Sequence, residues 1–440
     1  MEPVRVALKG GHAMPKQPML TVPLDLPDVR VLKTELTKNY ELVITVESTL
    51  ETATCPQCGR TLTKLHALDD PIMLRHLPIL GHPVYIRIRP KRFRCPDCDN
   101  RPTTTQRLRW YDPRALHTIP YERHLLLALV NSTVEDVVRK EDVSYDAVLG
   151  VLDAWIATSI DWNSVGPFAV LGIDEIALLK GHRNFIAVIT AQLERGEVRV
   201  LALLPDRLKA TVVAWLKRIP QERRSAITTV CTDLWEGYIT AAQEVLPHAT
   251  IVADRFHVAR LYRDCADTLR KETLRSLRAT KDKAILEEVK HTLWPFRKGS
   301  DDLEADEQAR LARLFERAPA LKTAYELRQD LTTIFDTASS RDDGLRQLQA
   351  WERKVAESGL SCFDSFLGTL ATWREQIANY FIARQTSGFV EGVNNKLKVI
   401  KRRCYGLTNL GRFFQRITLD VMGEQWFSPW RRAIASKSAS

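Results

Sequence analysis

The sequence lacks any long hydrophobic segment that is free of charge. No run of 18 or more apolar residues is uncharged, and residues 1–19 contain no continuous hydrophobic core. These absences argue against a membrane-spanning helix and against a secretory signal peptide. We therefore expect a soluble cytosolic protein with no membrane partner.

Cysteine is scarce, and its distribution does not suggest a disulfide framework. Of the eight cysteines, four form two CxxC pairs and the others are scattered. This usage is typical of metal binding in a reducing compartment.

The overall composition excludes disordered and fibrous proteins, because 45% of the residues are hydrophobic and 27% are charged. The 440 residues are enough for roughly two to four domains. Lysine and arginine (64) outnumber aspartate and glutamate (54), which gives a net charge of +10. A positive excess favours a polyanionic partner, with nucleic acid as the leading candidate.

The two CxxC pairs predict a structural zinc site. Cys55 and Cys58 form the first pair, and Cys95 and Cys98 follow after 36 intervening residues. Each pair can offer two thiolates to one tetrahedral zinc ion, and four thiolates leave no open position for catalysis. We therefore expect a zinc ribbon.

Between the pairs, residues 84–94 alternate apolar and basic side chains, which predicts one strand with a basic face. Two interpretations remain open: a solvated surface of the zinc-stapled fold, or a face that lies along DNA phosphates. The second assigns DNA binding to Arg87, Arg89, Lys91, Arg92 and Arg94.

Residues 120–160 have a helical pattern. Ser132 or Thr133 can cap a helix that runs through Lys140, and Ser144 can cap another toward Trp155. Two such helices resemble a DNA-binding helix-turn-helix. The second helix has acidic residues and no lysine or arginine, so a helical spacer is an equal alternative.

The region 168–257 predicts elements in the order βββαβαβ. Strands are expected at residues 168–179, 183–193, 197–204, 226–232 and 250–253, with helices at 208–219 and 234–245. This order gives a mixed five-stranded sheet in which the first, fourth and fifth strands are parallel. Asp174 lies in the first strand, and Asp233 and Asp254 follow the fourth and fifth. These carboxylates should converge at one edge of the sheet, as in a ribonuclease H-like core.

Residues 258–384 show helical periodicity without a strand pattern, so we expect a large all-α insertion. Its tryptophans at 294, 351 and 373 are expected in the core rather than as platforms for DNA bases.

A polar stripe precedes a basic patch near the end of the chain. Thr386 or Ser387 can cap a helix. In that helix one polar face contains Glu391, Asn394, Asn395 and Lys398. Residues 396–416 include seven basic side chains and no acidic one, so DNA affinity should fall steeply with salt. We assign DNA binding here to Asn394, Asn395, Lys398, Lys401, Arg402 and Arg403, with a solvated helix face as the alternative.

Three acidic residues could hold divalent ions. Enzymes that cut phosphodiesters often use two such ions, and magnesium needs only one or two protein oxygens per ion. Asp174, Asp233 and Glu391 are our candidates for binding magnesium or manganese. Glu175 and Glu236 are alternatives, although strand alternation turns Glu175 to the opposite face from Asp174.

Over about residues 40–420, the sequence resembles the ISL3-type bacterial insertion-sequence transposases. The resemblance rests on the two CxxC pairs and on Leu171-Gly-Ile-Asp174-Glu175, Cys231-Thr-Asp233, Ile251-Val-Ala-Asp254-Arg-Phe-His257 and Glu391-Gly-Val-Asn394-Asn395. It implies a ribonuclease H-like catalytic domain with Asp174, Asp233 and Glu391 as the acidic triad. It also implies an α-helical insertion before the glutamate.

The resemblance further implies a role for Asp254 and His257, which match a motif of the wider group. His257 either contacts the scissile phosphate or orients a neighbouring group, and a structural hydrogen bond at the strand end is an equal alternative. One feature departs from the family, which uses a basic recognition helix, whereas the helix after Ser144 carries acidic residues. The element that contacts the transposon end therefore stays open.

The resemblance implies a DDE-type DNA transposase that acts on double-stranded DNA. It would bind the terminal inverted repeats of its element, cut with divalent metal and join the freed 3′ hydroxyl to target DNA. Pairing of two ends suggests a homodimer, and the location would be cytoplasmic and nucleoid-associated. The alternatives are an inactive sequence-specific DNA-binding regulator and a structure-specific nuclease that cleaves without joining.

Together these inferences predict a multidomain α/β protein. Its parts are an unassigned leader or added strand (1–39), the zinc ribbon (40–110), the helix-turn-helix-like segment (115–162), the first part of the catalytic core (165–257), the insertion (258–384) and the final helix with the basic region (385–425).

Overall fold

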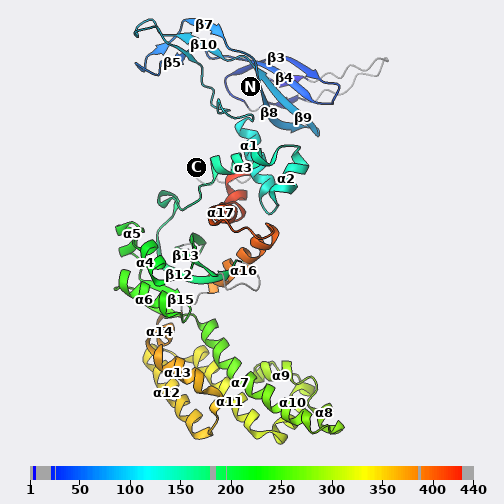
Figure 1. Ribbon diagram of the computed structural model, residues 1–440, viewed down its shortest axis with the longest axis vertical. Helices are drawn as coiled ribbons and strands as arrows, with labels where there is room; N and C mark the ends of the chain where they lie inside the picture. The colour runs from blue at the N-terminus through cyan, green and yellow to red at the C-terminus, as the bar shows by residue number, and fades with distance from the viewer. Residues whose placement is uncertain are drawn as a thin grey trace. The chain divides into compact units, whose positions relative to one another are not determined.

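The computed structural model describes residues 3–5, 21–24, 26–178, 185–194, 196–384 and 388–428 (Figure 1). The chain divides into two compact units. Unit 1 comprises residues 1–156 and 418–440, and unit 2 comprises residues 157–417. None of the helices in the described ranges is both long and apolar enough to cross a membrane.

Unit 1 contains a four-stranded sheet. Its strands, in spatial order, are β3 (Val29–Leu36), β4 (Leu42–Ser48), β9 (His82–Ile88) and β8 (Ile72–Ile79). Val84, Ile86 and Ile88 of β9 are fully buried, because alternate side chains of a strand face the same side. The segment 1–39 thus adds a strand, β3, to the sheet that follows. It also contains the paired short strands β1 (Pro3–Arg5) and β2 (Thr21–Pro23).

Shorter strands surround the cysteine pairs. One sheet pairs β5 (Ala53–Thr54) with β6 (Thr61–Leu62), and another has the order β11 (Thr103–Thr105), β10 (Lys91–Arg94) and β7 (Leu65–Leu68). The prediction of one strand over 84–94 is wrong, since β9 and β10 belong to different sheets. Pro90, which has no N–H to donate to a strand ladder, lies at the break.

Three helices complete this unit together with the last residues of a fourth. They are α1 (Ile119–Leu129), α2 (Val134–Glu141), α3 (Tyr145–Trp155) and α17 (Leu410–Phe427). Thr133 caps α2 and Ser144 caps α3, as the sequence predicts. Leu125 and Leu152 pack with Leu419 of α17 in one apolar cluster.

Unit 2 is built on a mixed five-stranded sheet. Its order is β14 (Val198–Leu204), β13 (Phe185–Leu193), β12 (Phe168–Ala177), β15 (Thr229–Thr232) and β16 (Thr250–Ala253). β12 is antiparallel to β13 and parallel to β15, which is parallel to β16. This order and these directions agree with the predicted βββαβαβ sequence of elements. The turn expected at residues 180–182 lies outside the described residues.

Helices cover both faces of this sheet. On one face lie α4 (Lys209–Leu216) and α6 (Glu236–Val245), with the short α5 (Gln221–Ser225) between them in the chain. On the other face, Ile176 and Val188 of the sheet pack against Leu397 of α16 (Gly388–Arg403) and Phe413 of α17. The sheet is therefore buried on both sides, as parallel strands require.

Between β16 and α16, the described chain is entirely helical (Figure 1). The helices are α7 (Arg255–Ala279), α8 (Lys283–Glu288), α9 (Leu293–Arg297), α10 (Ala305–Arg317), α11 (Pro319–Thr337), α12 (Arg341–Ser358), α13 (Asp364–Thr372), α14 (Arg374–Ala378) and α15 (Tyr380–Ala383). Trp351 is buried in their core and its indole N–H donates to the Leu327 carbonyl at 2.8 Å. The expectation of a core position is wrong for Trp294, which is 67% exposed.

Candidate active site and cysteine cluster

Two neighbouring parallel strands bring Asp174 and Asp233 together. The register pairs Gly172 with Cys231 and Ile173 with Thr232, so Asp174 of β12 lies beside Asp233, which directly follows β15. Asp174, Asp233 and His257 each offer a ligand atom, and these atoms lie within 4.8 Å of one another. The convergence expected from the strand ends is therefore present.

Asp254 and His257 form the edge of this cluster. Asp254 is buried at the start of α7, where its carboxylate accepts the Phe256 N–H at 3.0 Å and so caps the helix. One helical turn later, Nδ1 of His257 lies 2.6 Å from Asp233 and 3.0 Å from Asp254. These two hydrogen bonds, the stronger to Asp233, raise the pKa of His257 to about 10. His257 therefore contacts both carboxylates through Nδ1, which is compatible with an orienting role and with a structural hydrogen bond.

The environment of Asp174 suits a cation. Its side chain is only 8% exposed, and burial followed by the charge of Asp233 raises the pKa of Asp174 to about 7. A divalent cation with oxygen ligands would offset both effects. Among the described residues, Oδ1 of Asn394, Oγ1 of Thr232 and the Tyr238 hydroxyl are buried without a hydrogen-bond partner.

Helix α16 contributes the third part of the site. Asn394 is buried and its side-chain amide donates to the carboxylate of Asp174. Glu391 precedes Asn394 by three residues in the same helix. The side chain of Glu391 lies outside the described part of the chain, as do the predicted caps Thr386 and Ser387.

Two residues of α16 assigned to DNA binding face the protein instead. Asn394 contacts Asp174, and the Lys401 ammonium donates to the Ala177 carbonyl at 2.7 Å. Asn395, Lys398 and Arg402 are exposed, as their assignment requires. The helical period predicts that these polar residues share one side of α16. The burial of Leu397 and Ile400 determines which side of the helix packs against the protein.

Glu175 does not join the acidic cluster. It forms an ion pair with Arg207 at 3.2 Å, and the Arg207 guanidinium lies 4.1 Å from the centre of the Trp235 ring. Glu236 is exposed at the start of α6. Neither alternative carboxylate is therefore placed to replace Asp174 or Asp233. No sequence motif marks Arg207, which follows β14.

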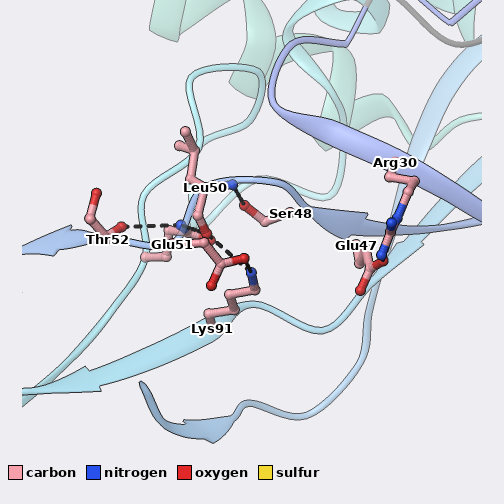
Figure 2. Close-up of polar contacts among 8 residues, drawn as sticks. Arg30, Glu47, Ser48, Leu50, Glu51, Thr52 and Lys91 are labelled. Atoms are coloured by element: carbon pink, nitrogen blue, oxygen red, sulfur yellow. Dashed lines mark hydrogen bonds and ion pairs between the residues drawn. The ribbon is translucent and has the colours of Figure 1, made fainter. Parts of the chain in front are cut away.

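The basic residues of β9 and β10 are largely engaged within the protein. The side chain of Lys91 is 12% exposed, and its ammonium lies 2.6 Å from Glu51 and 3.2 Å from the Leu50 carbonyl. Figure 2 shows this contact beside the separate Arg30–Glu47 pair. Lys91 thus links β10 to the segment that follows β4, and its assignment to DNA binding stays a prediction.

The arginines on either side of Lys91 also have partners. Arg87 lies 3.8 Å from Glu35, Arg89 donates to the Asp69 carbonyl, Arg92 lies 2.6 Å from the Asp69 carboxylate, and Arg94 contacts His66. These four arginines are exposed but do not share one strand, because β9 and β10 are in different sheets. Their assignment to DNA binding stays a prediction.

The four cysteines of the CxxC pairs form one cluster. Cys55 Sγ lies 3.8 Å from Cys98 Sγ, and Cys58 Sγ lies 3.8 Å from Cys95 Sγ. Four thiolates at ~2.3 Å from a tetrahedral zinc ion would be about 3.8 Å apart. Backbone N–H groups of Cys58 and Gln57 lower the pKa of Cys55 to about 7, which favours the thiolate that zinc requires. The residues therefore fit a structural zinc ion.

Comparisons with known proteins agree with both sites. Residues 171–417 match the DDE transposase model of the ISL3 group, and residues 51–98 match the zinc finger of the IS204, IS1001, IS1096 and IS1165 transposases. These matches define the class, a transposase of the DDE type. Since the first match covers more than half of the chain, the protein belongs to the ISL3 family of insertion-sequence transposases.

Individual relatives give the same result. The chain is 28% identical over 387 residues to the IS1001 transposase of Bordetella parapertussis, covering 87% of this chain and 92% of the relative. It is 22% identical over 403 residues to the IS1557 transposase of Mycobacterium tuberculosis, covering 85% and 88%. A solved Drosophila P element transposase strand transfer complex matches with a TM-score of 0.39 and 10% identity, over 69% of this chain and 91% of that chain. This last similarity is too low to define the fold.

Proposed function

We propose that this transposase cuts and joins DNA at the ends of its own element, using Asp174, Asp233 and Glu391 on a ribonuclease H-like core. The observation that carries the proposal is the meeting of Asp174 with Asp233, together with the contact from Asn394, one turn beyond Glu391, to Asp174. Two carboxylates from adjacent strands and one from a late helix form a suitable oxygen donor set for magnesium or manganese.

Each residue of the site has a distinct task in this proposal. Divalent ions, when bound, supply the charge that activates an attacking oxygen and stabilises the leaving oxygen. Asp174, Asp233 and Glu391 hold them, His257 orients Asp233, and Asn394 orients Asp174. Water attacks the phosphodiester at the element end, and the freed 3′ hydroxyl then attacks target DNA. No side-chain nucleophile is needed, unlike in tyrosine and serine recombinases.

DNA would be held by several elements. We assign end binding to the zinc ribbon and to α1, α2 and α3, and contacts near the cut to Asn395, Lys398 and Arg402. Two element ends must be paired, so we propose a homodimer. Its DNA substrate would place the protein with the nucleoid in the bacterial cytoplasm.

A cleavage and joining assay tests the proposal. The purified protein is incubated with a labelled duplex of the element end, a plasmid target, and magnesium, manganese or EDTA. We expect cleavage and joining with either metal and neither reaction with EDTA. A gel shift without cleavage would support a DNA-binding regulator, and cleavage without joining would support a nuclease. The end sequence comes from the inverted repeats that bracket the gene.

Asn394 provides a second test of the site. Replacing it by alanine removes the hydrogen bond that orients Asp174, and loss of such supporting contacts typically costs about 10–100-fold in activity or metal affinity. We expect slower cleavage that higher magnesium concentrations partly restore. The neighbouring exposed residue provides the matched control, because Asn395→Ala should leave the magnesium dependence unchanged. An equal magnesium dependence in Asn394→Ala and wild type would contradict the orienting role.

A further inference from the structure

The outward face of α16 ends in a fully exposed tyrosine. Asn394 and Leu397 are buried, whereas Lys398 and Arg402 are exposed. Tyr405 follows Arg402 by three residues, just past the end of the helix. Its side chain is 92% exposed, so the protein's own packing does not account for it.

The backbone at Tyr405 also argues for a function. The Tyr405 N–H donates to the Arg402 carbonyl and the Gly406 N–H to the Lys401 carbonyl, each at 3.2 Å. This is a Schellman motif, in which the first residue after the helix is left-handed and usually glycine. Here it is Tyr405, with a φ of +52°. A bulky residue is disfavoured in this conformation, and such outliers cluster at functional sites.

A second exposed tyrosine shows the contrast. Tyr40 also has a positive φ, of +60°, and is 67% exposed. However, its ring stacks on His82 with 6.3 Å between the ring centres. No residue in the described part of the chain stacks on the ring of Tyr405. Its aromatic face is therefore available to a ligand.

The charge around Tyr405 identifies the ligand as nucleic acid. The sequence has no acidic residue between Glu391 and Asp420, and two exposed basic residues, Lys398 and Arg402, closely precede Tyr405. Basic side chains that follow phosphates, next to an aromatic ring that stacks on a base, are typical of surfaces that bind opened DNA strands.

Helix α16 fixes the distance of Tyr405 from the reacting bond. Asn394 binds Asp174 and Lys401 binds the Ala177 carbonyl, so two contacts attach the helix to β12. From Asn394 to Tyr405 the chain spans about 16 Å at 1.5 Å per helical residue. If α16 lies along the DNA, this length spans about five base pairs at a rise of ~3.4 Å per base pair.

We propose that Tyr405 stacks on an unstacked base of the element-end DNA, about five base pairs from the cleaved bond. Lys398 and Arg402 bind the phosphates on either side of that base. This inference rests on the proposed function, because it takes the acidic cluster as the point of cleavage.

Fluorescence of 2-aminopurine tests this inference without relying on catalysis. The base analogue is placed at each position within ten base pairs of the element end, and the full-length protein is added in EDTA, which prevents cleavage. We expect increased fluorescence on binding at positions about five base pairs from the cut. Tyr405→Asn should abolish this increase and weaken binding about ten- to a hundredfold. Asparagine tolerates the left-handed backbone, so the turn is kept.

Three variants make the test specific. Tyr405→Phe and Tyr405→Trp should keep the signal, because stacking needs the ring and not the hydroxyl. Trp294→Asn, which removes an exposed aromatic ring from the helical insertion, should bind as wild type does. Unchanged fluorescence and affinity in Tyr405→Asn, loss of the signal in Tyr405→Phe, or an equal loss in Trp294→Asn would each overturn the inference. Failure of the wild type to bind the end duplex would instead reject the proposed function, and this inference with it.

Discussion

Replacing Asp174, Asp233 or Glu391 by alanine should abolish DNA cleavage and joining but leave binding of the element end largely intact. In the proposed mechanism these carboxylates hold the divalent ions and do not bind the DNA directly. If bound cations stabilise the transition state by ~4 kcal/mol, their loss slows cleavage about a thousandfold. Cleavage of a labelled duplex measures the rate, and a gel shift in EDTA measures binding.

Two other carboxylates serve as controls for the triad. Glu175 pairs with Arg207 on the opposite face of β12, and Glu222 is exposed on α5. Glu222→Ala should cleave at the wild-type rate, and Glu175→Ala should retain turnover even if its packing is weakened. A triad variant that still turns over would remove that residue from the site.

The loss of activity in Asp174→Asn should not come from unfolding. The pKa of Asp174 is raised to about 7 in the folded protein, above the value of ~3.9 in an unfolded chain. Ionised Asp174 therefore destabilises the metal-free fold as pH rises from about 4 to 7, and this cost persists at higher pH. Removing the charge should leave the melting temperature in EDTA at pH 8 unchanged or higher. A lower melting temperature would show that Asp174 stabilises the metal-free fold.

Much of the catalytic sheet could be predicted from sequence because local rules determine it. The order of strands and helices restricts how the strands can be connected in the sheet. Because the carboxyl ends of parallel strands lie at the same edge, Asp174 and Asp233 are expected to meet there. The hydrogen bonds of His257 could not be predicted from sequence, because they depend on the distances from Nδ1 to two carboxylates.

Contacts between distant segments could not be predicted from the sequence. The partner of Lys91, Glu51, lies 40 residues earlier, and no local pattern indicates that pair. For the burial of Asn394, a signal was present, because Leu397 and Ile400 follow at helical spacing and mark the buried side. The break between β9 and β10 was also marked, by Pro90.

Replacing Cys95 by serine should release zinc and unfold the ribbon. Among the residues that the structure describes, the buried members of the apolar cluster around the site are Cys55, Leu62, Phe93 and Cys95. This core is too small to fold without a metal. Structural zinc contributes about 10–16 kcal/mol in zinc-finger peptides, so its loss exceeds the stability of such a module. Elemental analysis should find one zinc per wild-type chain and less than one in Cys95→Ser.

The same variant separates the tasks of the two units. Because the acidic cluster lies entirely in unit 2, Cys95→Ser should lose affinity for the element end while hydrogen exchange in β12 and β15 stays as slow as in wild type. Cys362→Ser, which changes a cysteine of the helical insertion, should keep both zinc and affinity. If the wild type contains no zinc, or if Cys95→Ser binds the end duplex as tightly as wild type, the ribbon does not depend on the metal for DNA binding.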